Sequence, residues 1–389
     1  MKRIRRICIM VLIGMWIMIQ PIKAEEAPLQ TEDMVLEQLD LFDWSTIETL
    51  EAQLKASAPH MKDFDLSDQV IRLATGQERF SIEKIVQYVV GQFVGELQYY
   101  IRIIVRFILI VILCGFLQTL TTAFKSKDIT KIAFFVCYLL IIYTISQSLF
   151  VIVDLAMSTI SRLSEIMLVT LPTLLAFLAV SGYVTASSAL APVMISVLNG
   201  VTLVIQKIIL PIVVSIVILQ IMSSMSEEIK LDKFVDLFYK VVRWGLRAIF
   251  VLSIGIMGIY KLTLPTIDVA IKKGALNFSA AFIPVVGDAG KGAIEFMLTC
   301  AGLAKNAFAI GVIIWILIVA GLPLIRLFAY VAMYHLAAAI IQPVGDKKMS
   351  QIASILAKGC EFVLSCVGSV VILAISVMLV CTSIGMSIT

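Results

Sequence analysis

Charged residues are scarce in this chain. They make up 15% of the 389 residues, whereas hydrophobic residues make up 60%, and the mean hydropathy is +1.01. A water-soluble domain could not bury so much apolar surface. The formal net charge of +4 is small, which argues against a nucleic-acid partner. The composition therefore excludes an ordinary soluble protein and points to an integral membrane protein.

Histidine and cysteine are also few, which bears on catalysis and metal binding. The chain has two histidines, His60 and His335, and seven scattered cysteines without a C-x-x-C pair. Neither a disulfide framework nor a zinc site is expected from these. The catalytic patterns G-x-x-x-x-G-K-[ST], H-E-x-x-H and G-x-S-x-G do not occur. We therefore expect no enzyme, no catalytic residue, and no cofactor or metal.

Long apolar runs dominate the chain from about residue 107 onward. Because lipid offers no partner for backbone polar groups, spanning segments of this kind form helices. We predict an all-α, polytopic membrane protein with about 8–10 transmembrane helices of roughly 20 residues each, preceded by a small extracytoplasmic helical region. The weakly apolar segment 278–292 is either a span or a re-entrant or broken helix. The other expected spans are 107–124, 132–153, 166–180, 189–205, 208–225, 246–262, 307–324 and 362–384.

The first 24 residues have the layout of a secretory signal peptide. A basic start is followed by an apolar run and by Ala24 at the expected cleavage site. An uncleaved anchor helix is the alternative, and both place the following segment, 25–100, outside the cytoplasm. The Lys-rich loop 125–131 and the basic stretch 230–247 should then be cytoplasmic, as the positive-inside rule also requires.

Two helices are expected in the extracytoplasmic region. The segment 45–48 has the S-x-x-E form of a capping box, and apolar residues follow it at helical spacing. The charged tract 59–77 shows no sustained period, so we expect a loop with a short helical turn. A second, amphipathic helix begins at Ser81. It lies either on the membrane surface or a partner, or against the protein's own membrane bundle.

An internal repeat is indicated by prolines at equal spacing. Pro172 and Pro284 are 112 positions apart, and so are Pro211 and Pro323, each of which follows a leucine. A lysine-bearing amphipathic stretch then recurs at an offset of 118 positions. We predict two copies of one unit in the same orientation. The expected organisation is a signal peptide (1–24), an extracytoplasmic helical region (25–100), a first transmembrane hairpin (101–165), two membrane repeats (166–262 and 278–389) and a connector between them (263–277).

Prolines and charges inside the apolar runs are the candidate functional positions. The two Leu-Pro pairs predict either kinked helices in a packed bundle or broken helices that line a path at the repeat interface. Lys207 and Arg326 flank these pairs, and each either serves a conduit or snorkels from a helix end. His335 is either a proton relay or a hydrogen-bonded structural residue. The candidate conduit or structural residues are Lys207, Pro211, Pro284, Gly287, Pro323, Arg326, Gln342, Pro343 and Gly345.

Three segments of the chain resemble a known family. The segments 39–44 (LDLFDW), 282–287 (FIPVVG) and 337–345 (AAAIIQPVG), with the signal and span layout around them, resemble the stage III sporulation protein AE family of endospore-forming bacteria. The resemblance covers nearly the whole chain, and its most specific motif is 337–345. It implies a multi-pass protein of the mother-cell membrane around the forespore. It also implies a need for this protein in late forespore gene expression (sigma-G activity) after engulfment.

The resemblance further implies partners. These are the other subunits of the stage III sporulation AA–AH complex, including a ring-forming subunit and a cytoplasmic ATPase, and indirectly a partner protein of the forespore. Residues 25–100 would face the space between the two membranes. The protein would act in a channel or secretion-like complex, either as the conduit or permease or as an assembly platform. A secondary transporter of vegetative cells is the alternative function.

Overall fold

The computed structural model describes residues 44–57, 65–74, 127–225, 231–282, 287–344 and 347–384, with the isolated helical positions 101, 105, 109, 112 and 113. Within these residues the fold is all-helical, as predicted, and contains no strand. The helices are α3 (Ser45–Ser57), α4 (Leu66–Ala74), α6 (Lys127–Val180), α7 (Val184–Val204), the π turn η2 (Ile205–Ile209), α8 (Leu210–Met225), α9 (Asp232–Phe282), α10 (Gly287–Val344) and α11 (Lys347–Ser383).

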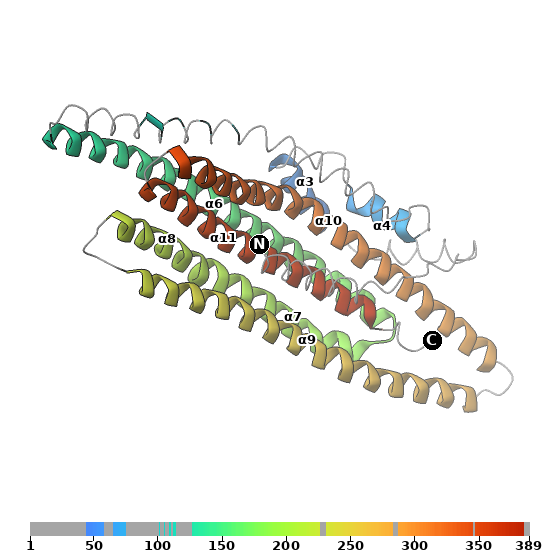
Figure 1. Ribbon diagram of the computed structural model, residues 1–389. Helices are drawn as coiled ribbons and strands as arrows, with labels where there is room; N and C mark the ends of the chain where they lie inside the picture. The colour runs from blue at the N-terminus through green and yellow to red at the C-terminus, as the bar shows by residue number, and fades with distance from the viewer. Residues whose placement is uncertain are drawn as a thin grey trace.

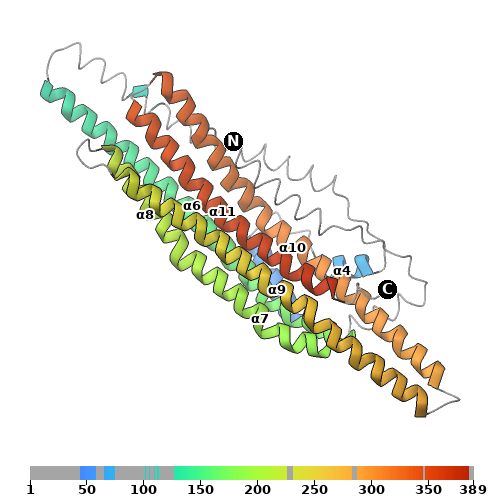
Figure 2. The same cartoon turned by 60° about the horizontal axis from the view of Figure 1, so that its bottom comes forward.

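Long helices lie side by side in one elongated bundle (Figure 1). The helices α6 and α11 each contact α10 and also the rod formed by α7, η2 and α8. Helix α9 lies along α7, α8 and α11 at the other side of the bundle (Figure 2). The junctions of α8 with α9 and of α10 with α11 lie toward the same end of the bundle (Figure 1). Helices α6 and α11 therefore lie between α10 and the α7–η2–α8 rod.

The described residues contain five helices that are long and apolar enough to cross a membrane. The sequence had predicted about eight to ten, and two fewer spans arise in residues 127–225. Four expected spans there fall on two continuous rods, α6 and α7–η2–α8. Charges such as Arg162 interrupt the hydropathy of α6 but not its backbone hydrogen bonds, because a charged side chain is compatible with a helix. The signal peptide and all of the expected span 107–124 except its helical positions 109, 112 and 113 lie outside the described residues.

The first Leu-Pro pair changes the backbone hydrogen-bond pattern of its helix but does not interrupt the helix. Pro211 has no N–H, and its ring would crowd the carbonyl of Lys207 in a regular α-helix. The preceding turn is a π turn, in which the N–H of Leu210 donates to the carbonyl of Ile205 five residues earlier. The wider turn accommodates the proline, and the rod continues through α8. Pro323 likewise lies within the continuous helix α10, so neither Leu-Pro pair breaks its helix.

Two short helices pack against the bundle near one of its ends. The expected helix at 45–48 is α3, and its residues Ile47 and Leu54 are buried. The tract 59–77, expected to be a loop with one short turn, contains the nine-residue helix α4 instead. The buried residue Val70 of α4 sits over Gly311 of α10, so closely that a Cβ on this glycine would lie 2.7 Å from a Val70 methyl group. The predicted helix from Ser81 lies outside the described residues.

The weakly apolar segment 278–292 is divided between two helices. Residues 278–282 complete α9, and residues 287–292 begin α10. Both helices extend well past the neighbouring end of α11, as Figures 1 and 2 show. Neither of these two pieces is among the candidate spans. The α9–α10 hairpin therefore projects beyond the rest of the described bundle.

Candidate functional site

Several helix ends meet at one level of the bundle. Helix α6 ends at Val180, a tight turn follows, and α7 starts at Val184. The turn depends on Gly182, whose φ of 91° is in the left-handed region that favours glycine. The C-terminal end of α11 lies at this level as well (Figure 2). We call this level the turn end of the bundle.

A buried carboxylate from α9 caps the first turn of α7. Asp268 is 4% exposed, and its two oxygens accept hydrogen bonds from the backbone N–H groups of Thr185 (3.0 Å) and Ala186 (2.7 Å). These N–H groups have no partner within the helix, and they carry the positive end of its dipole. Burial, and secondarily the nearby Asp268 charge, raise the pKa of Tyr183 in the turn. Asp268 thus ties α9 to the start of α7.

A buried ammonium from α10 caps the last turn of α11. Lys305 is 2% exposed, and its Nζ donates to the carbonyl oxygens of Ile384 and of Thr382, the latter at 3.5 Å. Carbonyl groups at a helix C-terminus lack partners and carry the negative end of the dipole. Lys305 therefore ties α10 to the end of α11.

The two contacts form a matched pair, which we call the end clamps. One arm of the α9–α10 hairpin supplies an anion to a helix start, and the other arm supplies a cation to a helix end. Sequence reasoning missed both Asp268 and Lys305. A signal was present, because each is a single charge inside or beside an apolar run, where a charge needs a specific partner. The partners themselves, 82 and 79 positions away, were not visible in the sequence.

A groove opens next to the end clamps. It has a volume of about 400 Å³ and lies between one face of α9 and the last described residues of α11. Most of its wall is apolar, with one amine and two hydroxyl groups. The lining residues are Lys261, Leu262, Pro265, Thr266, Val269, Ser383 and Ile384.

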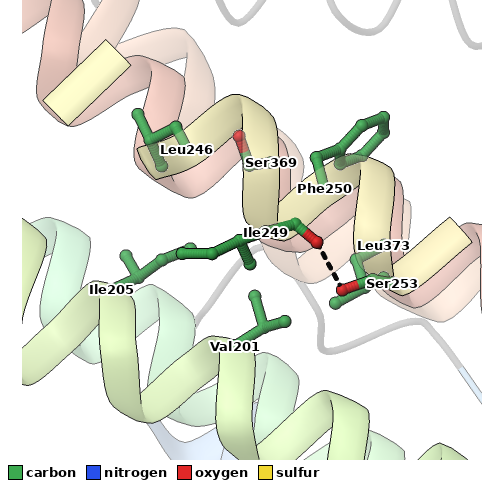
Figure 3. Close-up of a pocket in the computed structure, with 8 residues that line it drawn as sticks. All are labelled: Val201, Ile205, Leu246, Ile249, Phe250, Ser253, Ser369 and Leu373. Carbon is green, nitrogen blue, oxygen red and sulfur yellow. Dashed lines mark hydrogen bonds between the residues drawn. The ribbon is translucent and has the colours of Figure 1, made fainter. Parts of the chain in front are cut away.

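Four of the helices leave little space between the residues drawn in Figure 3. Between α7, η2, α9 and α11 there is a void of about 10 Å³, lined by the residues in Figure 3. That is room for about one water molecule. The hydroxyl of Ser253 donates to the carbonyl of Ile249 at 2.7 Å, so it is not directed into the void as a donor. The described side chains around this void therefore pack closely.

Two cations, Lys207 and Arg162, lie near the level of this void. The side-chain amide of Gln206 donates to the carbonyl of Met157 (3.2 Å) and to the hydroxyl of Ser161 (3.0 Å), so η2 and α6 are in register here. The next residue along each helix is a cation, Lys207 or Arg162, and Lys207 is exposed. From Val184 to Lys207 the rod rises about 34 Å, close to the roughly 30 Å hydrocarbon thickness of a bilayer. The snorkelling alternative for Lys207 therefore stays a prediction.

The structure does not bring the predicted candidates into one site. Lys207 and Pro211 lie on the α7–η2–α8 rod, whereas Pro323 and Arg326 lie on α10, and α6 and α11 pack against both. Arg326 is partly buried, and Gln342 is exposed near the end of α10. Gly287 and Pro343 lie in α10, while Pro284 and Gly345 fall outside the described residues.

His335 has a specific partner. Its Nε2 lies 2.7 Å from an oxygen of Glu361, which joins α10 to α11. This contact is the hydrogen-bonded arrangement that was one of the two alternatives for His335. Cys300, Cys360, Cys366 and Cys381 are free and buried. Within the part of the chain that the structure describes, no cluster of three potential metal ligands occurs.

Comparison with known proteins adds a family match. The sequence model of the stage III sporulation protein AE family matches residues 64–385. A Bacillus subtilis (strain 168) protein named "Stage III sporulation protein AE" is 27% identical over 256 residues, which cover 66% of this chain. The match spans 64% of that relative's length, which is less than two thirds. No solved structure matches.

Proposed function

The chain belongs to the stage III sporulation protein AE family, and on this basis we propose that it is a multi-pass membrane component of the complex joining mother cell and forespore during endospore formation. The family match over most of the chain carries this proposal. In this role the protein is needed for late forespore gene expression, measured as sigma-G activity, after engulfment. It has no catalytic role of its own. Its place is the mother-cell membrane around the forespore.

The proposed partners are the other AA–AH subunits, including a ring-forming subunit and a cytoplasmic ATPase. With the basic loops in the cytoplasm, the turn end faces the space between the two membranes. Helices α3 and α4 pack near this end, where the Trp44 ring meets the Phe308 ring of α10 edge to face at 5.7 Å between centroids. A fixed surface at this end suits the seating of an extracytoplasmic ring.

Between conduit and platform, the geometry favours an assembly platform. The small volume of the void in Figure 3 and the end clamps between distant helices support a tightly packed bundle. The distribution of the Leu-Pro pairs on separate sides of α6 and α11 agrees with this role.

A forespore-specific transcriptional reporter tests the proposed function. In a strain lacking this protein, we expect engulfed forespores with a silent late reporter, and restoration when the gene is expressed in the mother cell. Expression in the forespore alone is the matched control and should not restore the signal. Normal reporter activity and normal spores in the deletion strain would refute the sporulation role. They would favour a secondary transporter of vegetative cells.

The platform and conduit roles are separated by Lys207→Gln and Arg326→Gln. A platform tolerates the neutralised pair, so the complex assembles and the reporter remains active. A conduit that uses these cations loses reporter activity while the complex still assembles, as judged by co-purification of the ring-forming subunit. Loss of activity with intact assembly would therefore reject the platform role in favour of the conduit.

A further inference from the structure

Lys261 of α9 lacks a counter-charge among the described residues. It lies in an apolar stretch, between Tyr260 and Leu262, and is partly exposed. Neither the ion pairs nor the hydrogen bonds of the described residues include it. An ammonium group within a candidate span is costly without an anion or water. Lys261 is therefore available to an anionic partner.

The groove beside Lys261 has the composition of an amphiphile site. Its volume of about 400 Å³ falls within the roughly 300–1,000 Å³ range of ligand pockets. The apolar residues Leu262, Pro265 and Val269 line it along α9, and Ile384 closes it from α11. The hydroxyls of Thr266 and Ser383 each donate to a carbonyl of their own helix, so their oxygens remain able to accept. The groove thus combines an apolar wall with a single cation.

The level of the groove matches the edge of a bilayer. The end clamps, the start of α7 and the end of α11 all lie at the turn end. Lys261 lies seven residues from Asp268 along α9, or about 10 Å. A lysine side chain at that depth reaches the headgroup zone while its methylene groups stay among apolar neighbours. A lipid headgroup and a lipid chain would both find matching surfaces there.

We propose that this groove binds an anionic phospholipid, with the phosphate at Lys261 and an acyl chain along Leu262, Pro265 and Val269. Charge complementarity selects an anionic over a zwitterionic headgroup. The bound lipid would fill the space between α9 and the end of α11, next to both end clamps. The site is independent of the sporulation role proposed above.

Lipid retention by the purified full-length protein tests the site. The protein is reconstituted in phosphatidylcholine nanodiscs with or without phosphatidylglycerol, extracted in mild detergent, and its bound lipids are counted by native mass spectrometry. We expect retained phosphatidylglycerol in the wild type and about fivefold lower occupancy in Lys261→Gln. Lys261→Arg should retain the lipid. The matched control is Lys233→Gln, an exposed lysine at the other end of α9, and it should not change occupancy.

A second variant tests the apolar wall. Val269→Phe fills the groove without altering charge, so it should also lower phosphatidylglycerol occupancy, with gel filtration and circular dichroism as checks of the fold. Wild-type occupancy in both Lys261→Gln and Val269→Phe would overturn the proposal and leave Lys261 as a snorkelling residue. Competition by glycerol phosphate or inorganic phosphate at equal concentration would also overturn it, because it would identify a site for a soluble phosphate.

Discussion

At the scale of single residues, the end clamps make the most direct predictions. Asp268→Ala leaves two N–H groups of α7 without partners in a buried setting. Hydrogen bonds to a charged group contribute about 1.5–3 kcal/mol each, so we expect the free energy of unfolding to fall by about 3 kcal/mol. The measurement is an unfolding titration in mixed micelles. Asp236→Ala, at an exposed position of the same helix, is the control and should have little effect.

Substitutions of Lys305 test the other end clamp, in which the buried charge is positive. Lys305→Met keeps the length of the side chain but leaves the carbonyls of Thr382 and Ile384 without a donor, and we expect a loss of about 1–2 kcal/mol. Lys305→Glu places an anion against the negative end of the α11 dipole and should lower stability further. The same micelle titration measures both variants. Equal stability of the Met and Glu variants would show that the charge is irrelevant.

At the scale of elements, the close contact at Gly311 determines how α4 packs on α10. In Gly311→Leu the new side chain meets Val70 and Leu66 of α4, whose atoms would lie 2.7 Å and 3.3 Å from the Cβ alone. We expect α4 to detach from α10 while the bundle stays folded, seen as faster proteolysis within residues 44–74. Gly321→Leu is the control on the same helix, because a Cβ there meets nothing within 4 Å. Equal proteolysis of the two variants would contradict the assigned packing.

Much of the helical architecture was predictable from the sequence. The division of the apolar chain into separate helices was not. Apolar composition predicts helices in lipid, and the capping-box pattern correctly indicated α3. The sequence predicted separate spans on either side of Arg162 and of Lys207, but one continuous rod passes through each of these positions. Hydropathy reflects the cost of a charge in lipid, whereas helix continuity depends on backbone hydrogen bonds. The end clamps could not be predicted either, since each joins residues that only the packing of distant helices brings together. The two-copy repeat remains a prediction.

At the scale of the whole molecule, orientation is the main prediction. The positive-inside rule predicts that the turn end lies outside and the α8–α9 junction in the cytoplasm. We expect Val184→Cys, 62% exposed, to react with a membrane-impermeant maleimide in intact cells. Lys233→Cys should react only after permeabilisation. The unsubstituted protein serves as background for its own seven cysteines, and the reverse labelling pattern would invert the assigned topology.

The projecting hairpin has a mechanical consequence. Helix α9 continues 14 residues past Asp268 to Phe282, and α10 starts 18 residues before Lys305 at Gly287, which gives two arms of about 21 Å and 27 Å. A force on the tip of the α9–α10 hairpin therefore exerts a torque about the end clamps. The two clamps then act as pivot points. Because one clamp holds α7 and the other holds α11, a partner that pulls or tilts the tip loads both helices at once. Tension applied between two membranes would thus reach the bundle first through two buried charges.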